Sequence, residues 1–179
     1  MLDTRSCCLV VVDVQGKLAQ LMFDKDVLFK NIQILIVSAK ILDIPILWCQ
    51  QCPDTLGQTV PQIAELLADN QPMDKSSFSC CGDEIFCREL KKTGRKQVIL
   101  CGIETHVCIY QTAMHLLEKN FEVTLVTDAV SSRTAENKAL AIQKLNAEGV
   151  KPSSAEMAIF ELLKDARHPH FKQIAKLLK

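Results

Sequence analysis

Three residues able to perform covalent hydrolysis, an aspartate, a lysine and a cysteine, are placed near the ends of predicted strands. Asp13 directly follows the apolar run at 8–12, and Lys75 ends a short predicted strand at 73–75. Cys108 falls in the first turn of a helix predicted to follow the strand at 97–101. The helix dipole and the Lys75 ammonium would favour its thiolate, and Asp13 could carry a proton to a leaving amine. Free N–H groups at the helix start could hold an oxyanion.

Each of these residues also has an ordinary structural interpretation. An aspartate after a strand often caps a turn, a loop lysine is usually solvated, and one cysteine among nine usually packs in a core. Gln51 follows the strand predicted at 46–49 and either meets the substrate or ties down its loop. Residue types and spacing alone therefore predict an α/β protein and leave the cysteine site as a hypothesis.

Short apolar runs alternate with longer amphipathic stretches along the whole chain. The run at 8–12 (CLVVV) is typical of a strand buried on both faces. Ser153 and Glu156 have the spacing of a capping box and predict the start of a helix. The alternation predicts one α/β domain over residues 1–179, a three-layer α/β/α arrangement with a mainly parallel, Rossmann-like sheet. Chemistry in such folds gathers at the carboxyl ends of the strands. The predicted strands cover 8–12, 46–49, 73–75, 97–101 and 122–126, and the predicted helices 31–42, 61–68, 83–92, 106–119, 134–147, 155–163 and 169–179.

The charge balance limits the classes of partner. Lys plus Arg (21) equals Asp plus Glu (21), which argues against a nucleic acid as the main partner and fits a surface partly buried in a homo-oligomer. No apolar run approaches the roughly 20 residues that cross a bilayer, so no membrane partner is expected. The first residues do not resemble a secretory signal. We expect a cytoplasmic protein, with a mitochondrial or other organelle location left open.

The nine cysteines do not form the pattern of a disulfide-rich protein. Their number is odd and two pairs are adjacent in sequence. Cys49 and Cys52 have the spacing of half a zinc site or of a redox pair, but no second half follows at a usual distance. We therefore expect no metal and no cofactor, and the role of this pair stays open.

Three segments carry a family resemblance. The segment at 102–108 (GIETHVC) resembles the nucleophile motif of the isochorismatase-like cysteine hydrolases, G-[IV]-x-T-x-x-C. The segment at 11–15 (VVDVQ) resembles the aspartate motif of that family, and the segment at 74–79 (DKSSFS) its lysine motif. The order of the three motifs is also the family's order. The chain is most similar to the eukaryotic isochorismatase domain-containing proteins, through the segments at 51–57, 127–133 and 165–172.

The resemblance implies a parallel sheet between helix layers and a catalytic triad of Asp13, Lys75 and Cys108. It also implies a cis peptide bond between Ile103 and Glu104, which would aim the Glu104 N–H, beside that of Cys108, at the substrate oxygen. Gln51 and Ile103 are expected to line the substrate site. Members of this family form dimers to octamers, so the resemblance also implies a homo-oligomer.

Two departures from known members narrow the expected function. Nicotinamidases of the superfamily bind a metal through an Asp-x-His pair after the second strand, and residues 48–53 (WCQQCP) contain no such pair. Isochorismatases that split a vinyl ether typically lack the nucleophilic cysteine. We therefore expect a metal-independent cysteine hydrolase that cleaves a small amide-like C–N bond of a small-molecule substrate through a Cys108 thioester. A vinyl-ether hydrolase and a scaffold or interaction protein without turnover stay open as alternatives.

Overall fold

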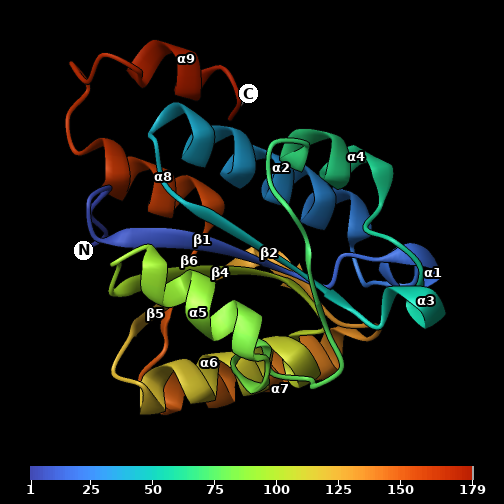
Figure 1. The fold of residues 1–179 in the computed structure, drawn as a ribbon. Helices are drawn as coiled ribbons and strands as arrows, with labels where there is room; N and C mark the ends of the chain where they lie inside the picture. The colour runs from blue at the N-terminus through green and yellow to red at the C-terminus, as the bar shows by residue number, and fades with distance from the viewer. Residues whose placement is uncertain (179) are drawn as a thin grey trace.

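A six-stranded parallel sheet forms the centre of the computed structural model, which describes residues 1–178 (Figure 1). Its strand order is β3-β2-β1-β4-β5-β6, and each neighbouring pair is parallel. This arrangement confirms the predicted α/β class. The strands are β1 Cys7–Val12, β2 Ile46–Gln51, β3 Met73–Lys75, β4 Gln97–Ile103, β5 Glu122–Ser131 and β6 Lys151–Ser153.

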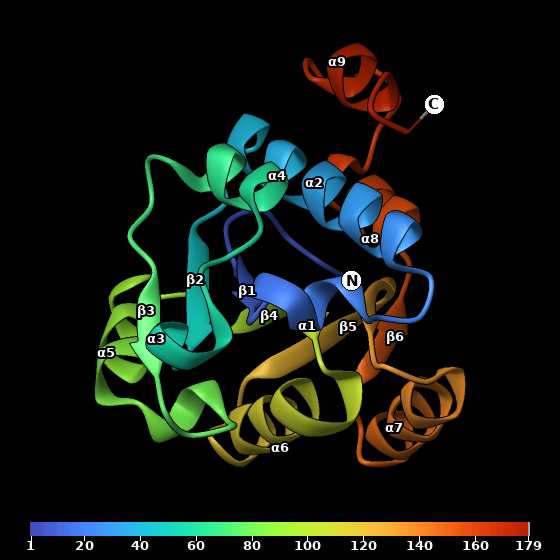
Figure 2. The same ribbon diagram turned by 90° about the vertical axis from the view of Figure 1, so that its right-hand side faces the viewer.

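Helices cover both faces of this sheet, as Figure 2 shows. The helices α2, α4 and α8 lie on one face, and α5, α6 and α7 lie on the other. The helix bounds are α1 Gly16–Gln20, α2 Lys25–Ile41, α3 Pro53–Leu56, α4 Pro61–Ala64, α5 Glu84–Lys92, α6 Tyr110–Glu118, α7 Ala135–Ala147, α8 Ala155–Leu163 and α9 Phe171–Ala175. Two 3₁₀ turns, Glu65–Leu67 and Cys80–Gly82, and one π-helical turn, Thr105–Ile109, complete the described helices.

The strand β1 divides its side chains between two hydrophobic cores. All six of its residues are buried. Cys7, Leu9 and Val11 pack with the helices on the α2 side, whereas Cys8, Val10 and Val12 pack with those on the α6 side. This two-residue alternation across a sheet covered on both faces explains why the run is apolar at every position.

Several element boundaries differ from the sequence predictions. The strand β6 was not predicted, because it is a three-residue edge strand that contains Pro152. The helix after it is capped by Ser154, whose side chain accepts a hydrogen bond from the Met157 N–H, and not by Ser153. The helix α2 begins six residues earlier than predicted. The final helix α9 covers only Phe171–Ala175, and the predicted end at Lys179 lies outside the described residues.

The segment that carries Cys108 also differs from its predicted form. The sequence predicts a regular helix from about residue 106, whereas α6 begins at Tyr110. Cys108 lies in the π-helical turn Thr105–Ile109 that precedes it. Such wider turns within helices occur frequently at functional sites.

Gly102 allows β1 and β4 to approach closely where β1 ends. It lies opposite Val12 in the register of these strands and has a φ of +120°. A Cβ atom at this position would collide with the Val12 backbone. The last residue of β1, next to Asp13, can therefore sit against β4 only because residue 102 is a glycine.

We predict that Gly102→Ala lowers the free energy of unfolding through both backbone strain and this collision. The collision alone should account for a loss of about 1–3 kcal/mol. Gly94→Ala is the matched control. Gly94 also has a positive φ, of +66°, but a Cβ there would meet no atom within 4 Å. Urea denaturation of both variants measures the difference, and equal losses would contradict the close approach as the reason for Gly102.

Candidate active site

An ion pair between Asp13 and Lys75 lies at the carboxyl ends of β1 and β3. Lys75 Nζ is 2.7 Å from Asp13 Oδ2, and the two side chains are 1% and 4% exposed. Asp13 follows β1 in a left-handed backbone conformation, φ 54°, which aspartate adopts more readily than most residues. Lys75 is the last residue of β3 and pairs with Gln51 in the strand register. Residues 62 positions apart in sequence thus meet at one edge of the sheet.

The Lys75 ammonium is also held by three neutral oxygen atoms. Gln51 Oε1 accepts from it at 2.7 Å, and the carbonyl oxygens of Ser77 and Phe78 accept at 3.2 Å each. The Gln51 amide in turn donates to the Ser76 carbonyl at 2.7 Å. The loop after β3 therefore wraps around the Lys75 side chain and leaves little of its charge for another partner.

Cys108 completes this group of side chains. Its thiol is 3.9 Å from Gln51 Oε1, the same oxygen that accepts from Lys75, and the residue is buried. Asp13 lies close enough to Cys108 for each group to change the pKa of the other. The structure thus places Asp13, Lys75, Gln51 and Cys108 together, although they come from four separate segments.

The charges around Cys108 favour its neutral thiol. Burial and the negative charge of Asp13 raise the pKa of the Cys108 thiol, and the Lys75 ammonium opposes this shift without cancelling it. Burial also raises the pKa of Asp13, against the opposing effect of Lys75. Burial would lower the pKa of Lys75, but the charges of Asp13 and neighbouring groups raise it. Lys75 lowers the pKa of the Cys108 thiol, as expected, but burial and Asp13, with which Lys75 is paired, outweigh its effect.

A cavity of about 100 Å³ opens onto this group. Ile103 and Glu104, expected at the substrate, line it together with Gln51. Leu18, Leu56 and Val107 form an apolar part of its wall, and Phe78, 55% exposed, lies at its border with solvent. The wall consists of Asp13, Leu18, Gln51, Leu56, Phe78, Ile103, Glu104, Val107 and Cys108.

Glu104 has its own fixed partner. The peptide bond between Ile103 and Glu104 is cis, and Glu104 Oε1 accepts from both the backbone N–H and Nε of Arg133 at 3.1 Å. Arg133 is not among the site residues that the sequence predicted. Arg133 ends the segment at 127–133, which carries part of the family resemblance. That resemblance was the only sequence signal that could have pointed to this residue.

Gln15 is a second residue whose role the sequence did not reveal. Its side chain is buried, and its Oε1 accepts from the Gln51 N–H at 2.6 Å. Its Nε2 donates to the carbonyls of Gln51 (3.1 Å) and Gly57 (2.7 Å). These bonds position the end of β2, and with it the Gln51 side chain that contacts both Lys75 and Cys108.

The structure provides no metal cluster among the described residues, and it places Cys52 next to the site. Residues 1–178 contain no group of three or more His, Cys, Asp or Glu side chains that could hold a metal ion. Cys49 is buried in the core, whereas the half-buried Cys52 thiol is 3.7 Å from the Lys75 carbonyl oxygen. In the same part of the chain, no helix is long and apolar enough to cross a membrane.

Comparison with known proteins identifies the family. A sequence profile of the isochorismatase domain matches residues 7–157. The chain belongs to the isochorismatase family. Isochorismatase domain-containing protein 2 of Danio rerio is 40% identical over 179 residues, covering 99% of this chain and 89% of the relative. The MAR1 ribonuclease of Caenorhabditis elegans superposes with a TM-score of 0.93 and 37% identity, covering 99% of this chain and 91% of that one. The YcaC gene product of Escherichia coli, described as an octameric hydrolase of unknown specificity, superposes with a TM-score of 0.93 and 25% identity. The match covers 99% of this chain and 88% of that one.

We predict that Lys75→Met lowers the free energy of unfolding by about 3–5 kcal/mol at neutral pH, because it leaves the Asp13 carboxylate buried without a countercharge. Burial already raises the pKa of Asp13, and the substitution would raise it further. A carboxyl with a raised pKa stabilises the fold below that pKa and loses this contribution as the pH rises through it. The deficit should therefore shrink on acidification.

Urea denaturation at pH 7 and at acidic pH measures this effect. Lys40→Met is the matched control, because Lys40 pairs with Asp69 at 2.9 Å on the surface and should lose no more than about 1 kcal/mol. Adding Asp13→Asn to Lys75→Met should restore part of the lost stability. A double variant less stable than Lys75→Met at neutral pH would contradict the buried-charge explanation.

Proposed function

We propose that this protein is a metal-independent cysteine hydrolase that cleaves a small, neutral amide-like C–N bond, with Asp13, Lys75 and Cys108 as its catalytic residues. The observation that carries the proposal is the buried contact between Lys75, Asp13 and Gln51 beside the Cys108 thiol, at the wall of a cavity. Membership of a family with hydrolase relatives supports the same reaction class.

In the first step, Cys108 Sγ attacks the substrate carbonyl carbon while its proton passes to Asp13. Asp13 Oδ2 is held by Lys75, whereas the buried Oδ1 has no hydrogen-bond partner among the described residues. Oδ1 is therefore the oxygen that takes the proton. A carboxylate whose pKa is raised by burial is a stronger base for this task. The N–H groups of Glu104 and Cys108 hold the oxyanion in the proposed mechanism.

In the second step, Asp13 returns the proton to the leaving nitrogen as the C–N bond breaks, which leaves a Cys108 thioester. Water then adds to the thioester with Asp13 as the base, releases the carboxylic acid and regenerates the thiol. The net reaction converts an amide and water into an acid and an amine. Lys75 stays protonated throughout and holds Asp13 Oδ2 and Gln51 in place.

The cavity wall favours a substrate without charge, because its two carboxylates, Asp13 and Glu104, are already paired with Lys75 and Arg133. No Lys or Arg side chain of the described residues lines the cavity, and the Lys75 ammonium behind it is fully engaged. Isochorismate is a dicarboxylate and would find no positive partner there. A compact apolar acyl group can pack against Leu18, Leu56 and Val107 instead. The cavity therefore supports amide hydrolysis over the vinyl-ether alternative.

The name of the C. elegans relative makes RNA cleavage a second candidate function. An RNA phosphodiester would need cations at the reacting centre, and the described wall of the cavity supplies none. Incubating the protein with a mixed-sequence RNA, beside the amide assay, tests this candidate. RNA degradation that Cys108→Ala abolishes would replace the amide proposal.

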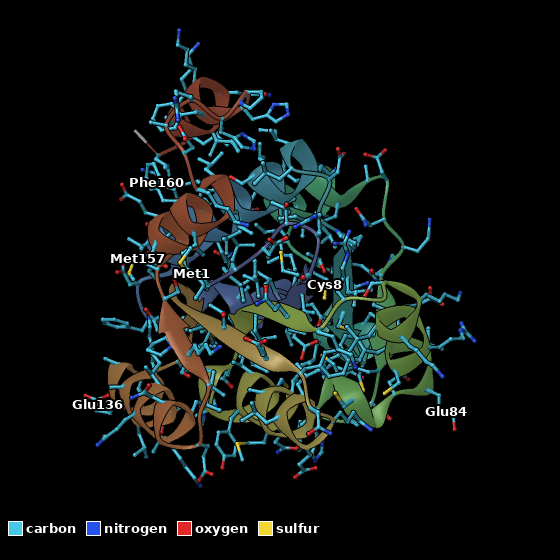
Figure 3. All side chains as sticks on the ribbon, turned by 90° about the vertical axis from the view of Figure 1, so that its left-hand side faces the viewer. Met1, Cys8, Glu84, Glu136, Met157 and Phe160 are labelled. Carbon is cyan, nitrogen blue, oxygen red and sulfur yellow. The ribbon has the colours of Figure 1, made fainter. Side chains whose placement is uncertain are left out.

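Apolar side chains on the surface support assembly into a homo-oligomer. Met157 and Phe160 of α8 are exposed and lie near the exposed Met1 at one side of the molecule (Figure 3). Leu21, Phe23 and Val27 form a second exposed apolar segment. The E. coli relative is octameric, which supports the same proposal for this chain. Analytical ultracentrifugation measures the oligomeric state directly. The cytoplasmic location stays a prediction.

We predict that Cys108→Ala abolishes ammonia release from a panel of small neutral amides, including propionamide and benzamide, while the fold is retained. Alanine removes the nucleophile from a site where only the sulfur is needed for bond formation. Cys87→Ser, which changes a half-buried thiol outside the cavity, is the matched control and should keep full activity. An activated ester of the same acid should add its acyl mass to Cys108 in peptide mass spectrometry. Unchanged turnover in Cys108→Ala would exclude the thioester mechanism.

We predict that Asp13→Asn has opposite effects on thiol reactivity and on turnover. The substitution removes a negative charge beside Cys108 and so lowers the pKa of the thiol, since Asp13 now raises it. Alkylation of Cys108 should then reach half its maximal rate at a lower pH, by about one pH unit or more. Turnover should be lost because asparagine cannot accept the proton. Asparagine also tolerates the left-handed backbone at this position.

The pH profile of iodoacetamide labelling, read by peptide mass spectrometry, measures the first effect, and the amide assay measures the second. Wild-type Cys108 should label slowly near pH 7 and faster as the pH rises. A variant that labels more slowly than wild type would contradict the effect of the Asp13 charge on the thiol pKa. A variant that keeps its turnover would exclude Asp13 as the base.

A further inference from the structure

A groove at the opposite end of β4 from the Cys108 segment combines an apolar floor with a cluster of positive charges. It has a volume of about 350 Å³ and lies between the end of α5, the turn before β4 and the end of α6. Both helices lie on the same face of the sheet (Figure 2). Leu90, Phe121 and the Cys87 thiol form its apolar part. We call this feature the basic groove, after the cations that line it: Lys91, Arg95, Lys96 and Lys119.

These four cations lack acidic partners. No acidic residue lines the basic groove, and none of the four forms an ion pair with any of residues 1–178. Glu89 binds Lys92 at 2.8 Å and Glu122 binds Lys151 at 2.7 Å, and Glu118, which precedes Lys119 in sequence, does not line the groove. In a chain whose formal net charge is zero, this is a local excess of four positive charges around one concave surface.

Helix dipoles account for only part of this arrangement. Lys91 lies in the last turn of α5 and Lys119 caps the end of α6, where a cation is favoured by the partial negative charge of the helix end. Arg95 and Lys96 lie beyond the end of α5, in the turn before β4. Arg95 Nη1 donates to the Thr4 carbonyl at 3.0 Å, which holds its guanidinium beside the groove. Lys96 Nζ lies 5.3 Å from the centre of the Phe121 ring.

We propose that the basic groove binds a small organic phosphate monoester with an apolar or aromatic body. A phosphate dianion matches several converging cations, with Arg95 able to bind it through two parallel hydrogen bonds. The body of the ligand packs on Leu90 and Phe121. The volume of the groove is in the range of small-molecule sites, about 300–1,000 Å³. The proposal is independent of the hydrolase mechanism, because the basic groove shares no lining residue with the Cys108 cavity.

The test is calorimetric titration of the full chain with phenyl phosphate at physiological salt, beside inorganic phosphate and phenol. Phenyl phosphate should bind more tightly than either fragment, because it alone contacts both the cations and the apolar floor. In a two-dimensional amide NMR spectrum it should shift the resonances of residues 94–96 and 119–121. The same spectrum of Cys108→Ala should show the same shifts.

Paired charge reversals give the matched comparison. Lys91→Glu with Lys119→Glu should weaken phenyl phosphate binding at least about tenfold. Lys30→Glu with Lys172→Glu changes two exposed lysines elsewhere, on α2 and α9, by the same total charge and should leave the affinity within twofold. Equal weakening by both pairs, or amide shifts outside the basic groove, would overturn the proposal. Inorganic phosphate binding as tightly as phenyl phosphate would overturn it as well. A single-stranded RNA that binds there and is not displaced by phenyl phosphate would replace the small ligand with a polymer.

Discussion

Burial of the ion pair between Lys75 and Asp13 is the constraint on which the candidate site depends. Each charge loses its hydration at an effective cost of several kcal/mol, and the pair is stable only with good geometry and further hydrogen bonds. Gln51 and the carbonyls of the loop after β3 supply those bonds to Lys75. They are available only when β1, β2 and β3 are aligned at their carboxyl ends. The site and the sheet therefore form together.

The same pair determines the chemistry that Cys108 can perform. Because Lys75 and Asp13 largely neutralise each other, burial affects the pKa of the neighbouring thiol more strongly than the positive charge of Lys75 does. A neutral thiol with an adjacent carboxylate requires a general base at the moment of attack, rather than a thiolate formed beforehand. Asp13 fits that role, since one of its oxygens is tied to Lys75 and the other has no hydrogen-bond partner among the described residues.

Two concave surfaces at opposite ends of β4 have contrasting chemistry. The wall of the Cys108 cavity combines apolar side chains with two carboxylates and has no cation, whereas the basic groove is lined by cations without an acid. A net charge of zero hides this separation, because it sums over the whole surface. The total charge argued against a long polyanion as the main partner, which stays a prediction, but it could not reveal a local excess of four cations.

The sequence by itself determined the fold class and the three main candidates of the site. Apolar runs such as that of β1 require a sheet covered on both faces, and the ends of such runs predicted where Asp13 and Lys75 lie. The prediction that those residues lie near Cys108 came from the family resemblance. Short elements such as α1, α3 and β6 were missed because three to five residues carry too little periodicity to detect.

Only the tertiary structure decided the contacts of Gln15 and Arg133, since their partners lie 36 and 29 positions away in sequence. The direction in which burial and Asp13 shift the pKa of the Cys108 thiol also came from the tertiary structure. A pKa depends on burial and on distances to other charges, and neither quantity is contained in the order of residues along the chain.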